Sequence, residues 1–170
     1  WGSNNDGQSS VPNGSYTQVV ADYNHTCALT DSSMVRCWGG NGVGQASAPN
    51  VEYIQITGQC GLDEVGIVSC WGFDVDNNTF RNFNLPNQGS YIQISADWSQ
   101  LCGLRSNGSI DCWSYYTSSI SNPETIWHPP AGHFVHISVG TAGYAVTSDS
   151  EVYGWGGNHN VPSNLSLMEW

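Results

Sequence analysis

The sequence predicts an all-β fold built from an array of about four short, blade-like units. Two patterns support this prediction. Trp-Gly pairs recur along the 170 residues, each later one preceded by a segment in which apolar and polar residues alternate. Cysteines also recur, in three pairs ten positions apart. Alternation with period two is typical of half-buried strands, and helical periodicity is absent from the chain.

The tryptophans set the length of the repeat. Their spacings are 37, 33, 42 and 42 residues, for the positions Trp1, Trp38, Trp71, Trp113 and Trp155. Only Trp113 is followed by serine instead of glycine. The alternating segments read YTQVV from 16, YIQIT from 53, YIQIS from 91 and FVHIS from 134. We therefore expect one repeat domain over 1–170, with units at about 1–37, 38–70, 71–112 and 113–154 and a closing or linking segment at 155–170.

The cysteine spacing predicts three stapled hairpins. When the first segment, CALTDSSMVRCW, folds about its Asp-Ser-Ser turn, its two cysteines oppose each other across an antiparallel pair. The threefold repetition favours the pairs Cys27–Cys37, Cys60–Cys70 and Cys102–Cys112 among fifteen possible connectivities. A fourth hairpin carries Tyr144 and Gly154 at the cysteine positions and has no staple. Structural zinc is the alternative, but its cysteines are usually two to four residues apart.

Each repeat thus supplies a strand, a hairpin and a Trp-Gly exit. Three strands and a short edge strand in about 40 residues are typical of one blade, so we expect a β-propeller-like array. One hairpin cannot bury both of its faces, so neighbouring units are expected to stack.

These residues resemble the repeat of the regulator of chromosome condensation family, a β-propeller family. They look most like its cysteine-bearing extracellular variant, found in the ectodomains of plant crinkly-type receptor kinases. The resemblance is carried by His25-Thr26-Cys27-Ala28-Leu29, by Cys37-Trp38-Gly39 and by Asn41, Gly44, Gln45 and Pro49. It implies a ring of seven blades, whereas 170 residues make about four. A small ring, an arc of a longer chain and an arc completed by another copy all stay open.

Composition excludes several classes of partner. The chain has no lysine, three arginines and a net charge of −11. Binding to nucleic acid needs Lys and Arg to displace phosphate counterions, and an anionic membrane surface would repel such a chain. No apolar run approaches the roughly 20 residues that span a bilayer, so we expect no membrane insertion.

The cysteines and the glycosylation sequons predict a secreted or cell-surface glycoprotein. Five Asn-x-Ser/Thr sequons begin at Asn13, Asn24, Asn77, Asn107 and Asn164. Sequons accept glycans, and paired cysteines persist as disulfides, in the secretory route. The chain starts with tryptophan instead of methionine, so we interpret it as a processed chain or as a piece of a longer one.

Metal and catalytic sites are not favoured. Four of the five histidines lie late in the chain, but His133 and His136 would point to opposite faces of a flat strand. The acidic loop from Asp74 to Asn78 carries oxygen ligands of the kind calcium takes, yet it lacks the glycine and the terminal glutamate of an EF-hand. No nucleophile, metal-helix or phosphate-loop motif is present, and paired acids for glycoside hydrolysis stay possible without any position being singled out. We expect no enzyme, no cofactor and no metal.

Aromatic residues outside the repeat core are the candidates for binding. Asp22-Tyr23 and Asp97-Trp98 fall in equivalent loops, and the remaining candidates are Tyr115, Tyr116 and Trp127. An aromatic ring beside a carboxylate suits a sugar, and Trp and Tyr are also common anchors of protein interfaces. Packing of the loops themselves is the plain alternative.

The predicted function is that of a non-enzymatic module whose propeller surface contacts a protein partner or assembles with itself. A lectin that binds glycans with loop aromatics and a structural subunit of an extracellular fibre or cell-surface coat are the alternatives. An inhibitor of an enzyme is a further one, because a bacterial β-lactamase inhibitor shares the propeller family, although it lacks the cysteine pattern.

Overall fold

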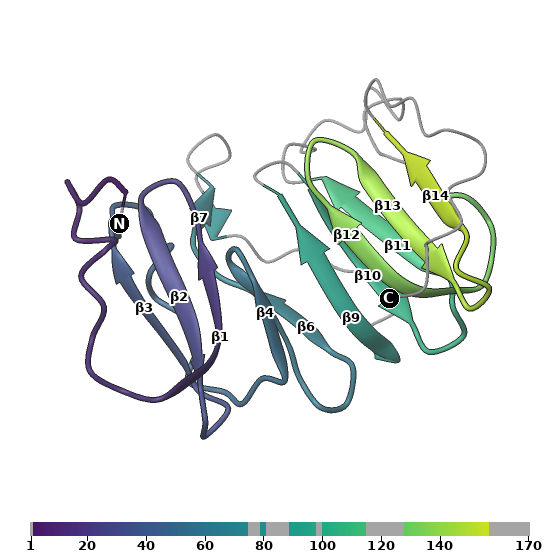
Figure 1. Ribbon diagram of the computed structural model, residues 1–170. Coiled ribbons are helices and arrows are strands. Elements are labelled where there is room, and N and C mark those ends of the chain that lie inside the picture. The colour runs from purple at the N-terminus through teal and green to yellow at the C-terminus, as the bar shows by residue number, and fades with distance from the viewer. Residues whose placement is uncertain (1, 75–78, 81–88, 98–99, 115–127, 157–170) are drawn as a thin grey trace. The chain divides into compact units, whose positions relative to one another are not determined.

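The computed structural model describes residues 2–74, 79–80, 89–97, 100–114 and 128–156. These residues form four three-stranded antiparallel sheets, here called blades 1 to 4 (Figure 1). Blade 1 is β1 (Tyr16–Ala21), β2 (His25–Thr30) and β3 (Val35–Gly39), and blade 2 is β4 (Gln55–Thr57), β5 (Cys60–Leu62) and β6 (Val68–Cys70). Blade 3 is β9 (Tyr91–Ala96), β10 (Gln100–Arg105) and β11 (Ile110–Ser114), and blade 4 is β12 (Phe134–Val139), β13 (Gly143–Thr147) and β14 (Val152–Trp155).

The predicted all-β, blade-like fold is confirmed. Each blade runs in sequence order from its first strand to its third, with the middle strand in the centre. A two-stranded pair, β7 (Phe73–Asp74) with β8 (Thr79–Phe80), follows blade 2. The described residues contain no helix, and none that could span a membrane.

The chain divides into two compact units, Trp1–Gly89 and Ser90–Trp170. Blades 1 and 2 belong to the first unit, and blades 3 and 4 belong to the second. The expected single domain over 1–170, with its repeat boundaries, stays a prediction.

The hairpin registers agree with the cysteine spacing. Cys27 pairs with Cys37, Cys60 with Cys70 and Cys102 with Cys112 across antiparallel strands, and all three pairs are disulfide-bonded with Cα–Cα distances of 4.0 to 4.1 Å. In the unstapled hairpin, Tyr144 stands opposite Gly154 in the same register. The described residues include no free cysteine.

The glycine of the Trp-Gly pair is required by the backbone. Gly39 and Gly72 have φ of 102° and 95°, in the left-handed region that favours glycine. At Gly39, an added Cβ would lie 2.7 Å from the carbonyl oxygen of Asn24. The motif therefore marks a turn that closes against the preceding loop.

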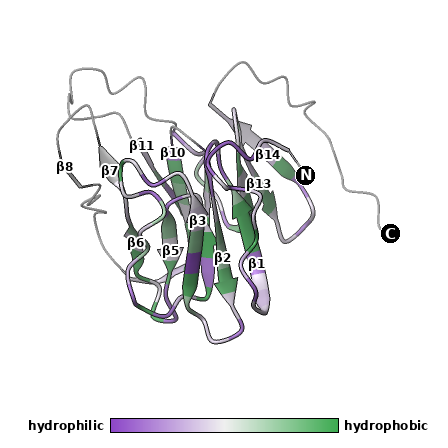
Figure 2. Ribbon diagram, turned by 90° about the vertical axis from the view of Figure 1, so that its left-hand side faces the viewer, coloured by the Kyte–Doolittle hydropathy of each residue, from purple (hydrophilic) through white to green (hydrophobic). Residues whose placement is uncertain are grey.

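Each blade has two different faces. The staple face carries the disulfide, or in blade 4 the equivalent Tyr144 and Gly154. The tryptophan face carries the repeat tryptophan and the fourth residue of the first-strand segment, which is Val19, Ile56, Ile94 or Ile137 in blades 1 to 4. Strands, more than loops, carry the hydrophobic residues (Figure 2). The core of each unit lies where the faces of its two blades meet.

Within each unit, the staple face of the first blade packs on the tryptophan face of the second. In the first unit, Cys27 and Leu29 of blade 1 cluster with Ile56 and Trp71 of blade 2. The core of the second unit repeats this arrangement, with Cys102, Leu104 and Ile110 of blade 3 against Ile137, Ala145 and Trp155 of blade 4.

A glutamine side chain clamps the two blades of each unit. In the first unit, Gln18 Nε2 donates to the carbonyl oxygen of Ile56 (2.7 Å), and the Ile56 N–H donates to Gln18 Oε1 (2.9 Å). Gln93 makes the same two bonds to Ile137, at 3.1 and 2.9 Å. The amide side chain thus substitutes for a neighbouring strand at the edge of the next sheet.

A second backbone contact recurs between the same blades. The carbonyl oxygen of Ser33, in the hairpin turn of blade 1, accepts the N–H of Tyr53, and that of Gly108 in blade 3 accepts the N–H of Phe134. Stacking of consecutive repeats therefore uses one set of contacts twice.

Candidate interaction surface

The loop between β1 and β2 presents the most exposed aromatic residue of the described chain. The side chain of Tyr23 is 95% exposed. The neighbouring Asp22 closes the loop, because its N–H donates to the carbonyl of His25 (3.0 Å) and its Oδ1 accepts the N–H of Tyr23 (2.7 Å). The carboxylate positions the loop, and the ring stands in solvent.

The equivalent loop of blade 3 is closed in the same way. The N–H of Asp97 donates to the carbonyl of Gln100, and Asp97 Oδ1 accepts the N–H of Gln100 at 2.8 Å. Both predicted carboxylates thus bind their own loops. The remaining candidates, Trp98, Tyr115, Tyr116 and Trp127, lie outside the described residues, as do Asn77 and Asn164.

His133 and His136, the two histidines considered as a metal-binding pair, make hydrogen bonds within the chain. His133 Nδ1 lies 2.9 Å from the carbonyl oxygen of Asn107, and His136 Nδ1 lies 3.0 Å from Gln93 Nε2. Among the described residues, no group of three or more His, Cys, Asp or Glu side chains could hold a metal ion. The acidic loop from Asp74 to Asn78, whose oxygen atoms are of the kind that bind calcium, lies outside the described residues at 75–78.

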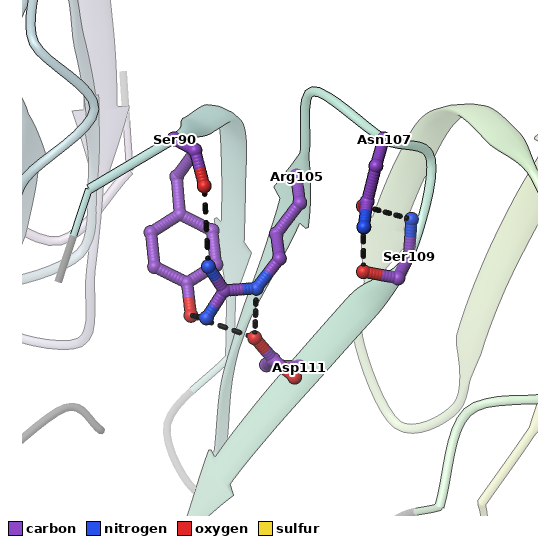
Figure 3. A network of polar contacts seen from close by, with 6 residues as sticks. Ser90, Arg105, Asn107, Ser109 and Asp111 are labelled. Carbon is purple, nitrogen blue, oxygen red and sulfur yellow. Dashed lines mark hydrogen bonds and ion pairs between the residues drawn. The ribbon is translucent and has the colours of Figure 1, made fainter. Parts of the chain in front are cut away.

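A polar network fixes the first strand of blade 3 (Figure 3). Arg105 Nε pairs with Asp111 Oδ2 at 2.6 Å, and its Nη2 donates to the Tyr91 hydroxyl, also at 2.6 Å. That hydroxyl donates to the same Asp111 oxygen (2.7 Å), and the guanidinium carbon lies 4.4 Å from the Tyr91 ring centroid. Burial, and then the bond to Asp111, raises the pKa of Tyr91 above its ordinary range. The three groups satisfy one another and hold β9 against β10 and β11.

An exposed aliphatic residue recurs at one position of the repeat. The residue after the first aromatic of the shared segment is Ile54, Ile92 or Val135 in blades 2 to 4, and each is more than half exposed. Blade 1 has Thr17 there. In the second unit, the Gln93 clamp and a bond from the Val139 N–H to Ser95 Oγ place β9 beside β12. Ile92 and Val135 therefore lie on adjacent strands, and neither belongs to the hydrophobic core cluster between blades 3 and 4.

Sequence reasoning missed this site because it sought aromatics in loops. The signal was present, since three of the four shared segments carry a β-branched aliphatic residue at the same place. A pattern of alternation alone cannot separate an exposed aliphatic residue from a buried one.

Comparisons with known proteins agree with the fold. Residues 16–45 match the model of the regulator of chromosome condensation (RCC1) repeat. No curated protein sequence matches the chain.

Solved structures give the fold over most of the chain. The chain is similar to human WBSCR16 (TM-score 0.63, 17% identity, covering 83% of this chain and 47% of that one). It is also similar to the CRINKLY WD40 ectodomain of the Arabidopsis thaliana receptor kinase ACR4 (TM-score 0.59, 21% identity, covering 81% and 49%). A third is Prp20p of Saccharomyces cerevisiae, described with its binding to Gsp1p and histones (TM-score 0.61, 15% identity, covering 86% and 47%). The chain spans about half the length of each of these proteins.

The predicted repeat type is therefore confirmed. The three disulfides are consistent with an extracellular location.

Proposed function

We propose that this chain is a non-enzymatic, secreted glycoprotein module that presents a propeller surface to a protein partner. The observation that carries the proposal is the exposed aliphatic pair Ile92 and Val135, at 53% and 56% exposure. Neither residue contributes to the core of its blade, and apolar residues on adjacent strands suit the centre of a protein interface. With a net charge of −11, the surface favours a neutral or basic partner.

The test is binding of a partner from the extracellular fraction of the producing organism. The double variant Ile92→Asp/Val135→Asp places two carboxylates at the apolar pair. The matched control is Val65→Asp, because Val65 is 64% exposed in the hairpin turn of blade 2. We expect a partner retained by the wild type and the control to be lost by the double variant. Equal retention by all three proteins would rule out this surface.

Secretion is tested by the occupancy of the sequons. Asn13 and Asn107 are exposed, whereas the Asn24 side chain packs against Gly40 and is 3.4 Å from Gln45 Nε2. A glycan on Asn24 would displace this packing. After secretory expression, we expect enzymatic deglycosylation and peptide mapping to find aspartate at Asn13 and Asn107 but asparagine at Asn24. Unmodified peptides at every sequon would contradict the proposed secretory role.

A lectin is favoured by one observation, the 95% exposed ring of Tyr23 beside Asp22. An aromatic face with a nearby polar group suits a sugar. A glycan array compared between the wild type and Tyr23→Ala tests this second candidate. It is excluded if the wild type binds no glycan or if the variant binds equally well.

A further inference from the structure

Three Asn-Gly dipeptides share one sequence but lie in three different environments. They are Asn13-Gly14, Asn41-Gly42 and Asn107-Gly108. The backbone nitrogen that follows an asparagine can attack the carbonyl carbon of the asparagine side chain, and glycine hinders this attack least because it has no side chain of its own. The dipeptide sequence alone therefore ranks the three positions equally, whereas the structure separates them.

Two of the dipeptides are held in ways that oppose this reaction. Both polar atoms of the Asn41 side chain are bonded, because Oδ1 accepts the N–H of Ala46 at 2.9 Å and Nδ2 donates to Ser47 Oγ at 3.0 Å. In the third dipeptide the attacking nitrogen is engaged, since the buried Gly108 donates its N–H to the carbonyl oxygen of Arg105 at 2.9 Å. Reaction at either position first has to break these hydrogen bonds.

The dipeptide Asn13-Gly14 is open, in the loop before β1. Asn13, Gly14 and Ser15 are all exposed. Among the described residues, neither the Asn13 side chain nor the Gly14 N–H makes a hydrogen bond. The loop is held by other atoms, because the Tyr16 hydroxyl donates to the carbonyl oxygen of Pro12 at 3.0 Å and the Tyr16 ring lies against Gly14. Both reacting groups are therefore accessible in a loop that keeps its place.

Arg36 adds a positive charge to this dipeptide. Its Nη1 donates to the carbonyl oxygen of Asn13 at 3.2 Å. That oxygen and the Gly14 nitrogen belong to one peptide group, so negative charge that develops on the nitrogen is shared with the oxygen by resonance. A guanidinium is permanently charged and stabilises such an anion. The carbonyl oxygen of Asn41 accepts a backbone N–H and that of Asn107 lies beside a histidine, so neither has a comparable cation.

We propose that Asn13-Gly14 is a site of spontaneous modification, at which the Arg36 guanidinium promotes conversion of Asn13 to aspartate and isoaspartate. Solvent takes the proton of the Gly14 amide, the Gly14 nitrogen bonds to Cγ of Asn13, and Nδ2 takes up a proton and leaves as ammonia. The product is a cyclic succinimide. Water then opens one of the two ring bonds to the Gly14 nitrogen, which gives isoaspartate or aspartate, so the whole sequence consumes water and releases ammonia. This inference goes beyond the proposed partner surface and does not depend on it.

Glycosylation and this reaction exclude each other at Asn13. The residue begins a sequon, and a glycan is attached at Nδ2, the atom that has to leave as ammonia. A glycosylated Asn13 is therefore blocked, whereas an unglycosylated chain gains a carboxylate next to Arg36 and becomes more negative than −11. Protection by the glycan rests on the proposed secretion, but the reaction does not. Isoaspartate distinguishes the two routes, because enzymatic deglycosylation leaves only aspartate.

The experiment follows all three dipeptides in one sample. The full chain is produced without glycans and with its disulfides formed, and is incubated at neutral pH and physiological temperature beside a reduced sample unfolded in guanidinium. Ion exchange separates the more acidic products, and peptide mapping with electron-transfer fragmentation identifies isoaspartate at each position. We expect similar rates at the three positions in the unfolded chain. In the folded chain, Asn13 should react at least about tenfold faster than Asn41 and Asn107, whose hydrogen bonds have to break first.

Two variants test the role of the guanidinium. Arg36 is exposed, so we expect Arg36→Met and Arg36→Lys to fold, and circular dichroism checks this. Arg36→Met should slow the reaction of Asn13 about three- to tenfold, as expected for one charge-assisted hydrogen bond weakened by solvent, and Arg36→Lys should recover part of the loss. The rates at Asn41 and Asn107 are the internal controls and should not change.

Three results would overturn the proposal. They are the absence of isoaspartate at Asn13, equal rates at the three dipeptides of the folded chain, and an unchanged rate at Asn13 in Arg36→Met. Because the chain carries no glycans in this experiment, none of these results bears on secretion or on the partner surface.

Discussion

The two hydrogen bonds between the Gln93 side chain and the backbone of Ile137 are expected to stabilise the contact between blades 3 and 4. Gln93→Ala removes both bonds to the backbone of Ile137, which is 1% exposed, and the contact with His136. A buried backbone group left without a partner costs about 1–3 kcal/mol. Two such groups, with some access for water through the vacated space, give about 2–4 kcal/mol. For a unit of this size, that corresponds to a fall of roughly 10–20 °C in Tm.

Urea unfolding followed by tryptophan fluorescence measures the loss, and hydrogen exchange of the Ile137 amide localises it to the clamp. Ile92→Ala is the matched control, because it truncates the exposed neighbour of Gln93. Gln93→Glu keeps the acceptor and loses the donor, so its deficit at neutral pH should shrink in acid, where the protonated carboxyl donates again. If Gln93→Ala costs no more than Ile92→Ala, the clamp does not stabilise the blade contact.

Three further outcomes are expected. Burial lowers the pKa of His25 more than nearby Asp22 raises it, so the first unit should lose stability as pH falls below about 6.5. His25→Gln should flatten this loss in urea midpoints measured at pH 7.5 and 5, and an unchanged slope would refute the assignment. The raised pKa of Tyr91 means that its contribution is complete below about pH 10 and is lost as pH rises further, and Tyr91→Phe should reduce this alkaline loss in thermal melts. Replacing Cys102 and Cys112 together by alanine opens a loop of about ten residues and should lower the free energy of unfolding by about 2–3 kcal/mol, which denaturant titration would measure.

The hairpins could be predicted because the residues that determine them lie close together in the sequence. The ten-residue spacing and a turn at its centre fix which residues face each other, so Cys27 opposite Cys37 follows without knowledge of any other blade. Tyr144 opposite Gly154 follows from the same spacing without a staple. The glycine that follows every repeat tryptophan except Trp113 could also be predicted locally, because it adopts a positive φ.

The contacts between blades could not be predicted in this way. Gln18 and Gln93 occupy the polar positions of an alternating strand, which the pattern assigns to solvent, yet each binds a backbone about 40 residues away. Glutamine recurs at one position of the shared segment, and this recurrence was the sequence feature that could have indicated the contact. The sequence suggested Asp22 and Asp97 as ligand-binding residues, but each carboxylate accepts a hydrogen bond from its own loop. In a short turn, the N–H groups of the loop are the donors nearest to the side chain.

The same repeat position compared across blades separates two kinds of exposed aliphatic residue. Val19 and Ile56 are both β-branched and occupy equivalent places, yet one is exposed and the other buried, so a neighbouring blade decides the difference. Ile54, Ile92 and Val135 are exposed in three successive blades, including blades 2 and 4 whose tryptophan faces are covered. Another blade of this repeat type would therefore bury Val19 and leave the second set in solvent. The second set therefore stays available to a partner that is not a propeller blade.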